Sequence, residues 1–206
     1  MKGKFVTIEG CEGAGKSTQL RLIHEELDAR GIPAVFTREP GGTPIAEQIR
    51  AIILDANNTE MEPITELLLY AAARRQHTTE LIRRALDEGK LVFCDRYIDS
   101  TTAYQGYARG LDGQTVAYLN RLAMADVQID LTLFLDVPPG EGFTRKGGAD
   151  KTDRLENEQA SFHRAVYDGF RAIAAQEPRF VAVRAAGTKY ETHAEIMRIL
   201  QAHSIV

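Results

Sequence analysis

The segment Gly10–Ser17 reads GCEGAGKS, a complete G-x-x-x-x-G-K-[ST] phosphate loop. It follows an apolar run, Phe5–Ile8, and precedes apolar residues at the spacing of a buried helical face, Leu20, Ile23 and Leu27. In such a strand–loop–helix unit the glycines let backbone N–H groups point at phosphate oxygens, and the helix adds its positive end at the same place. The sequence therefore predicts a nucleoside triphosphate site, in which Lys16 reaches the β/γ-phosphates and Ser17 can ligate Mg²⁺.

Four further short apolar runs predict strands that alternate with helical patterns: Ala34–Thr37, Leu91–Cys94, Leu131–Leu135 and Phe180–Val183. Their hydrophobicity is continuous, which is typical of parallel strands buried on both faces. We expect an α/β protein of the P-loop NTPase fold, a three-layer α/β/α domain with a five-stranded parallel sheet and a short lid. In such sheets ligands bind beyond the carboxyl ends of the strands, so residues that follow a strand are the functional candidates.

Length and charge limit the partners. A chain of 206 residues suits one domain, here residues 1–206, and the net charge of −4 gives no electrostatic footprint for nucleic acid or a membrane. No run approaches the roughly 18 apolar residues of a spanning helix, and we expect a cytoplasmic protein. Two cysteines, Cys11 and Cys94, indicate neither a disulfide framework nor a zinc site.

Acidic and basic residues directly follow the predicted strand Leu91–Cys94. A carboxylate at this place beside the phosphate loop, Asp95, can hold Mg²⁺ or its water ligands, and the planar guanidinium of Arg96 suits phosphate oxygens. Asp136, which ends the strand Leu131–Leu135, competes for the metal role on periodicity alone. We favour Asp95 because of the adjacent arginine and interpret Asp136 as a carboxylate that caps a turn.

A second glycine-rich turn follows the predicted strand Ala34–Thr37. The segment Arg38–Thr43 reads REPGGT, and a helix is expected to begin near Thr43-Pro44, because proline suits a first helical turn. We interpret the segment as a second anion site, and the alternative is a simple helix-starting loop. A protein that only hydrolyses its triphosphate needs one phosphate cradle, whereas one that transfers the phosphoryl group to another phosphate needs two.

Two other segments each have an ordinary and a functional interpretation. On the helix predicted over Ile64–Leu86, Tyr70 and Arg74 share a face, where a ring can stack on a base and an arginine can bond its edge. Taken alone, they are interpreted as a core residue and a solvated charge. The charged segment Arg145–Arg154 is either a solvated loop or a mobile lid of a phosphoryl-transfer enzyme.

Together these motifs resemble the thymidylate kinase family. The matching segments occur in the family's order and approximate spacing over almost the whole chain: Glu9–Ser17, Arg38–Gly42, Tyr70 with Arg74, Asp95–Ser100, Ala103–Gly106 and Asp153–Glu156. The resemblance implies an enzyme that phosphorylates dTMP to dTDP with ATP and Mg²⁺, binds no nucleic acid or membrane, and forms a homodimer.

The resemblance implies the residues that bind ATP: Gly10, Cys11, Glu12, Gly13, Ala14, Gly15, Lys16, Ser17, Thr18 and, near adenine, Arg145. Ser17 and Asp95 are implied to serve the metal. The phosphate loop has no basic residue at its variable places, so the chain is similar to the bacterial type whose lid, here about residues 145–156, supplies the catalytic arginine. The implied catalytic residues are Lys16, Asp95, Arg96 and Arg154.

The resemblance also implies the dTMP contacts. Arg38 and Arg96 hold the phosphate, Glu12 meets the sugar 3′-hydroxyl or a metal water, and Tyr104 crowds the 2′ position and so favours deoxyribose.

The thymine contacts are implied in the same way. Tyr70 stacks on the thymine ring, Arg74 contacts a thymine oxygen, and Thr101 and Gln105 line the base pocket.

Three other functions remain alternatives at this point. The nearest is a kinase for another nucleoside monophosphate, such as dUMP or a ribonucleotide. A nucleotide-dependent switch is less consistent with the sequence, because the guanine-reading N-K-x-D pattern is absent and a switch needs no second phosphate cradle. A nucleic-acid ATPase would be expected to have a basic track, which the net charge of −4 does not favour.

Overall fold

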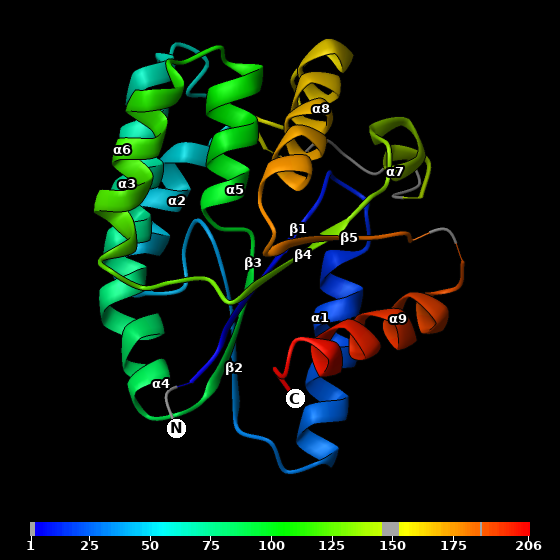
Figure 1. Cartoon of the computed structure of the whole chain (residues 1–206). Coiled ribbons are helices and arrows are strands. Elements are labelled where there is room, and N and C mark those ends of the chain that lie inside the picture. Colours follow the sequence, from blue (N-terminus) through cyan, green and yellow to red (C-terminus); the bar gives the residue numbers. More distant parts are fainter. Residues whose placement is uncertain (1–2, 146–152, 186) are drawn as a thin grey trace.

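Five parallel strands form one sheet in the order β2-β3-β1-β4-β5 (Figure 1). The computed structural model describes residues 3–145, 153–185 and 187–206. The strands are β1 (Phe5–Glu9), β2 (Ala34–Arg38), β3 (Leu91–Asp95), β4 (Leu131–Leu135) and β5 (Phe180–Val183). The five apolar runs of the sequence are therefore the five strands, and the predicted α/β fold with a five-stranded parallel sheet is confirmed.

The helices alternate with the strands along the chain. They are α1 (Lys16–Ala29), α2 (Pro44–Leu54), α3 (Pro63–His77), η1 (Thr78–Ile82), α4 (Arg83–Asp87), α5 (Ile98–Thr101), η2 (Thr102–Ala108), α6 (Gly113–Met124), α7 (Pro139–Arg145), α8 (Ala160–Gln176) and α9 (Lys189–Ala202). The long helix predicted over Ile64–Leu86 is the continuous run α3-η1-α4, and η1 is a π-helical turn within it. As expected, α2 begins at Pro44.

Both faces of the sheet are covered, which gives the predicted three layers (Figure 1). Successive residues of a strand point to opposite faces, and β1 shows this directly. Val6 and Ile8 join one apolar cluster with Ile23 of α1 and Leu200 of α9. Phe5 faces the other way.

The second face is covered by two groups of helices. Under β1 and β3, Phe5 and Val92 pack with Ile82 and Leu86 of the η1-α4 run. Under β4 and β5, the rings of Phe134 and Phe180 pack with α8. The helical run and α8 therefore bracket the segment that follows β3.

The carboxyl ends of three neighbouring strands meet at one edge of the sheet. In the parallel register Asp95 of β3 lies beside Ile8 of β1 and Arg38 of β2. The segments that follow these strands therefore begin at the same edge of the sheet: the phosphate loop after β1, the REPGGT turn after β2 and Arg96 after β3. Within the described parts of the chain, no helix is both long enough and apolar enough to cross a bilayer.

Candidate active site

A cavity of about 220 Å³ opens at the carboxyl ends of β1, β2 and β3. The structure brings most of the predicted site residues into its wall: Glu12, Lys16, Ser17, Arg38, Tyr70, Arg74, Asp95, Arg96, Thr101, Tyr104 and Gln105. These residues come from the phosphate loop and α1, from β2 and α3, and from the segment that runs from β3 to η2. The cavity thus lies at the edge of the sheet where ligands of parallel sheets usually bind.

The phosphate loop wraps the amino end of α1. Gly13 and Gly15 have φ of +73° and +100°, in the left-handed region that glycine adopts without strain. The buried Lys16 folds back over the loop, and its Nζ donates hydrogen bonds to the carbonyl oxygens of Gly10 and Cys11, both at 3.1 Å. Burial lowers the pKa of Lys16, and the nearby charge of Arg96 adds to this effect. The lysine is thus a poorly solvated cation for which phosphate oxygens are better partners.

Helix α7 lies directly on this loop. A Cβ atom added to Gly13 would lie 1.9 Å from the carbonyl oxygen of Gly142, and one added to Gly142 would lie 2.1 Å from the carbonyl oxygen of Glu12. Backbone therefore packs on backbone at this place. Gly140, on the same helix, has no atom within 4 Å of such a Cβ. The close approach therefore requires glycine at positions 13 and 142 but not at position 140.

Asp95 ends β3 inside the cavity, and its Oδ1 atom is buried with no hydrogen-bond partner among the described residues. A buried carboxylate oxygen without a partner is costly, and a cation or its water ligands would satisfy it. Ser17, an exposed residue, lines the same cavity. Asp136 faces α8 instead, where Oδ1 accepts a hydrogen bond from Tyr167 Oη at 2.9 Å.

The oxygen atoms of Asp95 and Ser17 fit a Mg²⁺ ion that is shared with phosphate oxygens. Within the described ranges no three His, Cys, Asp or Glu side chains converge on a metal cage.

Arg96 lines the cavity directly after β3. Its φ of +68° is unusual for a residue with a side chain. The guanidinium donates to Gly10 O at 3.1 Å and pairs with Glu12, and it lies 5.2 Å from the centre of the Tyr104 ring. Burial opposes the charge, but the neighbouring Tyr104, Glu12 and Asp95 raise the pKa of Arg96 well above its ordinary value. Arg96 therefore links the phosphate loop to the residues after β3 as a permanent cation.

A buried carboxylate fixes the backbone beside Arg96. Glu9 accepts hydrogen bonds from Tyr97 N at 2.8 Å and from Ser100 Oγ at 2.6 Å. Burial, and next the charge of Asp99, raise the pKa of Glu9 to about 7. The first strand thereby positions the turn that carries the arginine.

Arg38 is an exposed arm at the rim of the cavity. Its Nη2 donates to both carboxylate oxygens of Glu47 at 3.1 Å, and its side chain is 56% exposed. Arg50, on α2, lines the same side and donates to Pro40 O at 2.7 Å. The REPGGT turn and α2 therefore each bring one arginine to the cavity, and cations of this kind suit a phosphate site.

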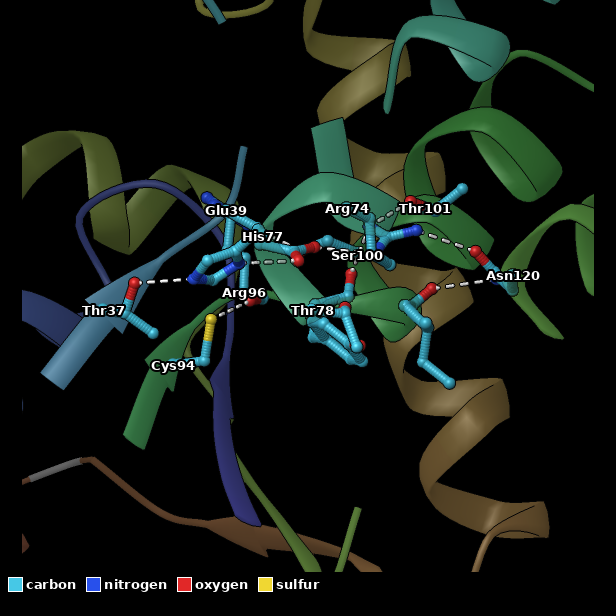
Figure 2. Close-up of polar contacts among 12 residues, drawn as sticks. Thr37, Glu39, Arg74, His77, Thr78, Cys94, Arg96, Ser100, Thr101 and Asn120 are labelled. Atoms are coloured by element: carbon cyan, nitrogen blue, oxygen red, sulfur yellow. Dashed lines mark hydrogen bonds and ion pairs between the residues drawn. The ribbon is translucent and has the colours of Figure 1, made fainter. Parts of the chain in front are cut away.

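Arg74 is held by buried partners beside the cavity (Figure 2). Nε donates to Glu39 Oε2 at 2.6 Å, Nη1 to Asn120 Oδ1 at 2.9 Å, and Nη2 to Thr101 Oγ1 at 2.8 Å. The interpretation of Arg74 as a solvated charge is wrong, because partners from three distant segments replace its water. Tyr70, one turn earlier, is half-buried and lines the cavity.

Glu39 is shared between Arg74 and a buried histidine. Nδ1 of His77 donates to Glu39 Oε1 at 3.0 Å, and Thr37 Oγ1 lies 2.8 Å from Nε2 of the same ring (Figure 2). Both side chains are almost completely buried. Hydrogen bonds among these side chains thus join β2, the turn after it and α3 beside the cavity.

Arg154 is not among the described residues that line the cavity. Its Nε donates to Ile53 O at 3.1 Å and its guanidinium pairs with Glu66. Its neighbours Asp153 and Leu155 do line the cavity. The other predictions about the lid concern residues 146–152 and the side chain of Arg145, which lie outside the described part of the structure.

The thymidylate kinase family model matches residues 8–196. The chain belongs to the thymidylate kinase family. It is 49% identical to the thymidylate kinase of Geotalea uraniireducens, over 94% of each chain. It is 45% identical to that of Bacillus pumilus, over 98% of this chain and 96% of that protein. The crystal structure of thymidylate kinase from Ehrlichia chaffeensis is similar, with a TM-score of 0.80, 34% identity, and coverage of 98% and 99%.

Sequence reasoning missed several cavity residues of this thymidylate kinase family member. Besides Arg50, they include Glu39, Ser100, Asp153, Glu156 and His163. Glu39, Ser100, Asp153 and Glu156 lie inside the segments that carried the resemblance, so their place in those segments was an available signal. Arg50 and His163 lie in helices with no local motif, and only the packing of α2 and α8 brings them to the cavity.

Proposed function

We propose that this protein transfers the γ-phosphoryl group of ATP to dTMP, giving ADP and dTDP for dTTP synthesis. Membership of the thymidylate kinase family supports the reaction. The single observation in the structure that carries it is the cavity with two anion sites, the phosphate loop at Lys16 and the arginine pair Arg38 and Arg96. Two phosphate sites joined by one arginine suit a donor and an acceptor that are both phosphates.

The chemistry that we propose depends on position and charge. Lys16 and the loop N–H groups hold the phosphates of ATP, and Arg38 and Arg96 hold the phosphate of dTMP. The acceptor oxygen is largely ionised near neutral pH, so in-line transfer needs little proton movement. The buried, permanently charged Arg96 stabilises charge on the transferred group more strongly than an exposed cation would.

We propose Mg²⁺ as the metal, held by Ser17 and the unpartnered oxygen of Asp95 together with phosphate oxygens of ATP. When bound, the ion neutralises charge on the phosphates. Among the described residues, no group of three or more acidic, histidine or cysteine side chains could hold a metal by itself. This is consistent with Mg²⁺, which usually binds one or two protein ligands and takes its other ligands from phosphate and water.

The base and sugar contacts proposed for dTMP follow the cavity wall. Tyr70 stacks on thymine, and Arg74 presents its guanidinium edge to a thymine oxygen with Thr101 beside it. The burial of Tyr104 next to Arg96 supports its proposed place against the sugar, where we propose that its ring excludes a 2′-hydroxyl.

The lid over residues 145–156 within a single domain of residues 1–206 stays a proposal, as does the catalytic role of Arg154. Because Arg154 is paired with Glu66, that role requires a different position of its side chain when both nucleotides are bound.

We also propose that the protein acts as a homodimer through α3 and α6. These helices lie side by side, and each exposes an apolar pair one turn apart: Ile64 and Leu68 on α3, and Tyr118 and Leu122 on α6 (Figure 1). Leu68, Tyr118 and Leu122 are each more than half exposed. An exposed apolar patch on two adjacent helices suits a self-complementary interface. Light scattering on Leu122→Glu should show a monomer.

The reaction is tested by measuring ADP formation with Mg-ATP and each of dTMP, dUMP, dCMP, dGMP, AMP and no acceptor. We expect turnover that depends on dTMP. Preference for dUMP or AMP would instead support a kinase for another nucleoside monophosphate. Hydrolysis without an acceptor would support a nucleotide-dependent switch or ATPase.

A further inference from the structure

One buried carboxylate outside the proposed catalytic set connects the base pocket to two arginines. Glu66 lies in the first turn of α3 and is completely buried. Its Oε1 accepts from Gln105 Nε2 at 2.8 Å and from Arg109 Nε at 3.3 Å. Its Oε2 accepts from Arg109 Nη2 at 3.2 Å and is paired with Arg154.

Glu66 is an ionised group in this environment. Burial by itself raises the pKa of a carboxyl, but the hydrogen bonds from Arg109, Gln105 and Arg154 and the charge of Arg109 outweigh it, and the pKa of Glu66 is lowered. An ionised carboxylate can only accept hydrogen bonds. Any group that faces it must therefore be a donor.

This requirement determines how the amide of Gln105 is turned. An amide has a donor end and an acceptor end, and Glu66 takes the donor end. The acceptor end, Oε1, has no hydrogen bond among the described residues, and Gln105 lines the cavity. The side chain is 1% exposed, so its amide stays in this place, and the hydrogen bond to Glu66 sets which of its two ends faces the cavity. The carbonyl oxygen therefore faces the space proposed for the base.

We propose that Glu66 is a positioning residue that makes the base pocket select a base with a ring N–H, an imide such as thymine, against cytosine. The proposal rests on the proposed function. The fixed oxygen of Gln105 accepts the N–H of thymine at N3, whereas cytosine has an unprotonated nitrogen there. Two acceptors would then face each other in a buried site, where an unmade hydrogen bond is costly.

The variant Glu66→Gln separates this role from simple charge neutralisation. At Oε2 the new NH₂ group would face two guanidinium donors, from Arg109 and Arg154, whereas at Oε1 it faces one, the more distant Nε of Arg109 at 3.3 Å. It therefore takes the Oε1 position and faces Gln105. The Gln105 amide then turns its oxygen toward residue 66 and its NH₂ toward the cavity. We expect the ratio of the dCMP Kd to the dTMP Kd to fall about ten-fold or more, which is the direction set by reversing one buried hydrogen-bond pair.

Glu158→Gln is the matched control. Glu158 pairs with Arg109 at 2.6 Å and does not touch Gln105, so this variant removes one charge from the same cluster. We expect its Kd ratio to stay within about two-fold of the wild-type value, because Glu158 is a partly exposed partner of Arg109 and makes no hydrogen bond to Gln105.

The experiment is isothermal titration of dTMP and dCMP into the full chain and the two variants, with thermal unfolding to show that each is folded. If Glu66→Gln does not fold, Glu66→Met/Arg109→Met removes one acid and one base together and should lose the same discrimination. An unchanged ratio in a folded Glu66 variant, or an equal loss in Glu158→Gln, would overturn the proposal. Failure of the proposed function is seen separately, as wild-type protein that does not form ADP with dTMP.

Discussion

Nε of Arg74 lies 2.6 Å from Oε2 of Glu39, and both side chains are 2% exposed (Figure 2). The two residues are 35 positions apart and come from the turn after β2 and from α3. Their pairing holds a cation at the base side of the cavity without water. It follows that the pair cannot be broken on one side without leaving a buried charge.

We predict that Glu39→Gln destabilises the protein by about 3–5 kcal/mol, the usual cost of removing one partner of a buried ion pair. Urea unfolding measures it. The control is Glu195→Gln, whose arginine partner Arg198 is 69% exposed, and it should change the free energy of unfolding by less than about 1 kcal/mol. Equal effects of the two variants would contradict a dry Arg74–Glu39 pair.

The contact between the phosphate loop and α7 gives a second prediction. Gly142→Ala places a methyl group against the Glu12 carbonyl, so the loop or the helix must shift at a cost of about 1–3 kcal/mol. We expect the KM for ATP to rise about ten-fold, since about 1.4 kcal/mol is ten-fold in binding, with the Kd for dTMP unchanged. Gly140→Ala, on the same helix with open space around it, should behave as wild type. If both alanine variants have the same KM, the contact has no effect on ATP binding.

The buried Glu9 predicts how stability depends on pH. Its pKa is raised to about 7 by burial and then by Asp99, against an ordinary value of 4.5, so between these values the folded state holds a proton that the unfolded state has lost. This contribution to stability is fully present below about pH 4.5 and is lost as the pH rises through 7, with a slope of up to about 1.4 kcal/mol per pH unit.

Glu9→Gln, which imitates the protonated acid, should flatten that part of the profile. Urea unfolding at pH 5 and pH 8 for wild type and variant gives the comparison. A wild-type profile that rises with pH, together with a parallel one for the variant, would show that Glu9 is ionised throughout.

Arg154 gives the fourth prediction. If it supplies charge to the transferred group, Arg154→Ala should lower kcat by about 10³-fold or more while the Kd for ATP changes little. Arg164→Ala is the control, because Arg164 is exposed and pairs with Asp168 on the same helix. A large loss of ATP affinity with near-normal turnover of bound substrate would remove Arg154 from the catalytic set.

The strands and the site edge were predictable because their causes are local. A run such as Leu131–Leu135 is apolar at every position except Thr132, so both faces must be covered, and this indicates a parallel sheet without any knowledge of its neighbours. The choice of Asp95 over Asp136 also used local information, the adjacent Arg96. In the structure Asp95 lines the cavity and Asp136 is bonded to α8, and the metal role of Asp95 stays a prediction.

The burial of Arg74 was not predictable in the same way. Its charge suggests solvent, and only the convergence of Glu39, Thr101 and Asn120 from other segments makes a dry position possible. The pairing of Arg154 with Glu66, 88 residues away, has the same origin. Tertiary partners of charged residues leave no periodic signal in a sequence.

The most direct test of the central claim follows the phosphorus atom itself. Protein is mixed with Mg-ATP labelled with ³²P at the γ-phosphate and with dTMP, and the labelled products are separated. The account predicts that the label appears in dTDP, and that Lys16→Ala and Arg96→Ala each abolish this transfer. Label that appears only as inorganic phosphate, at a rate unchanged by dTMP, would contradict it.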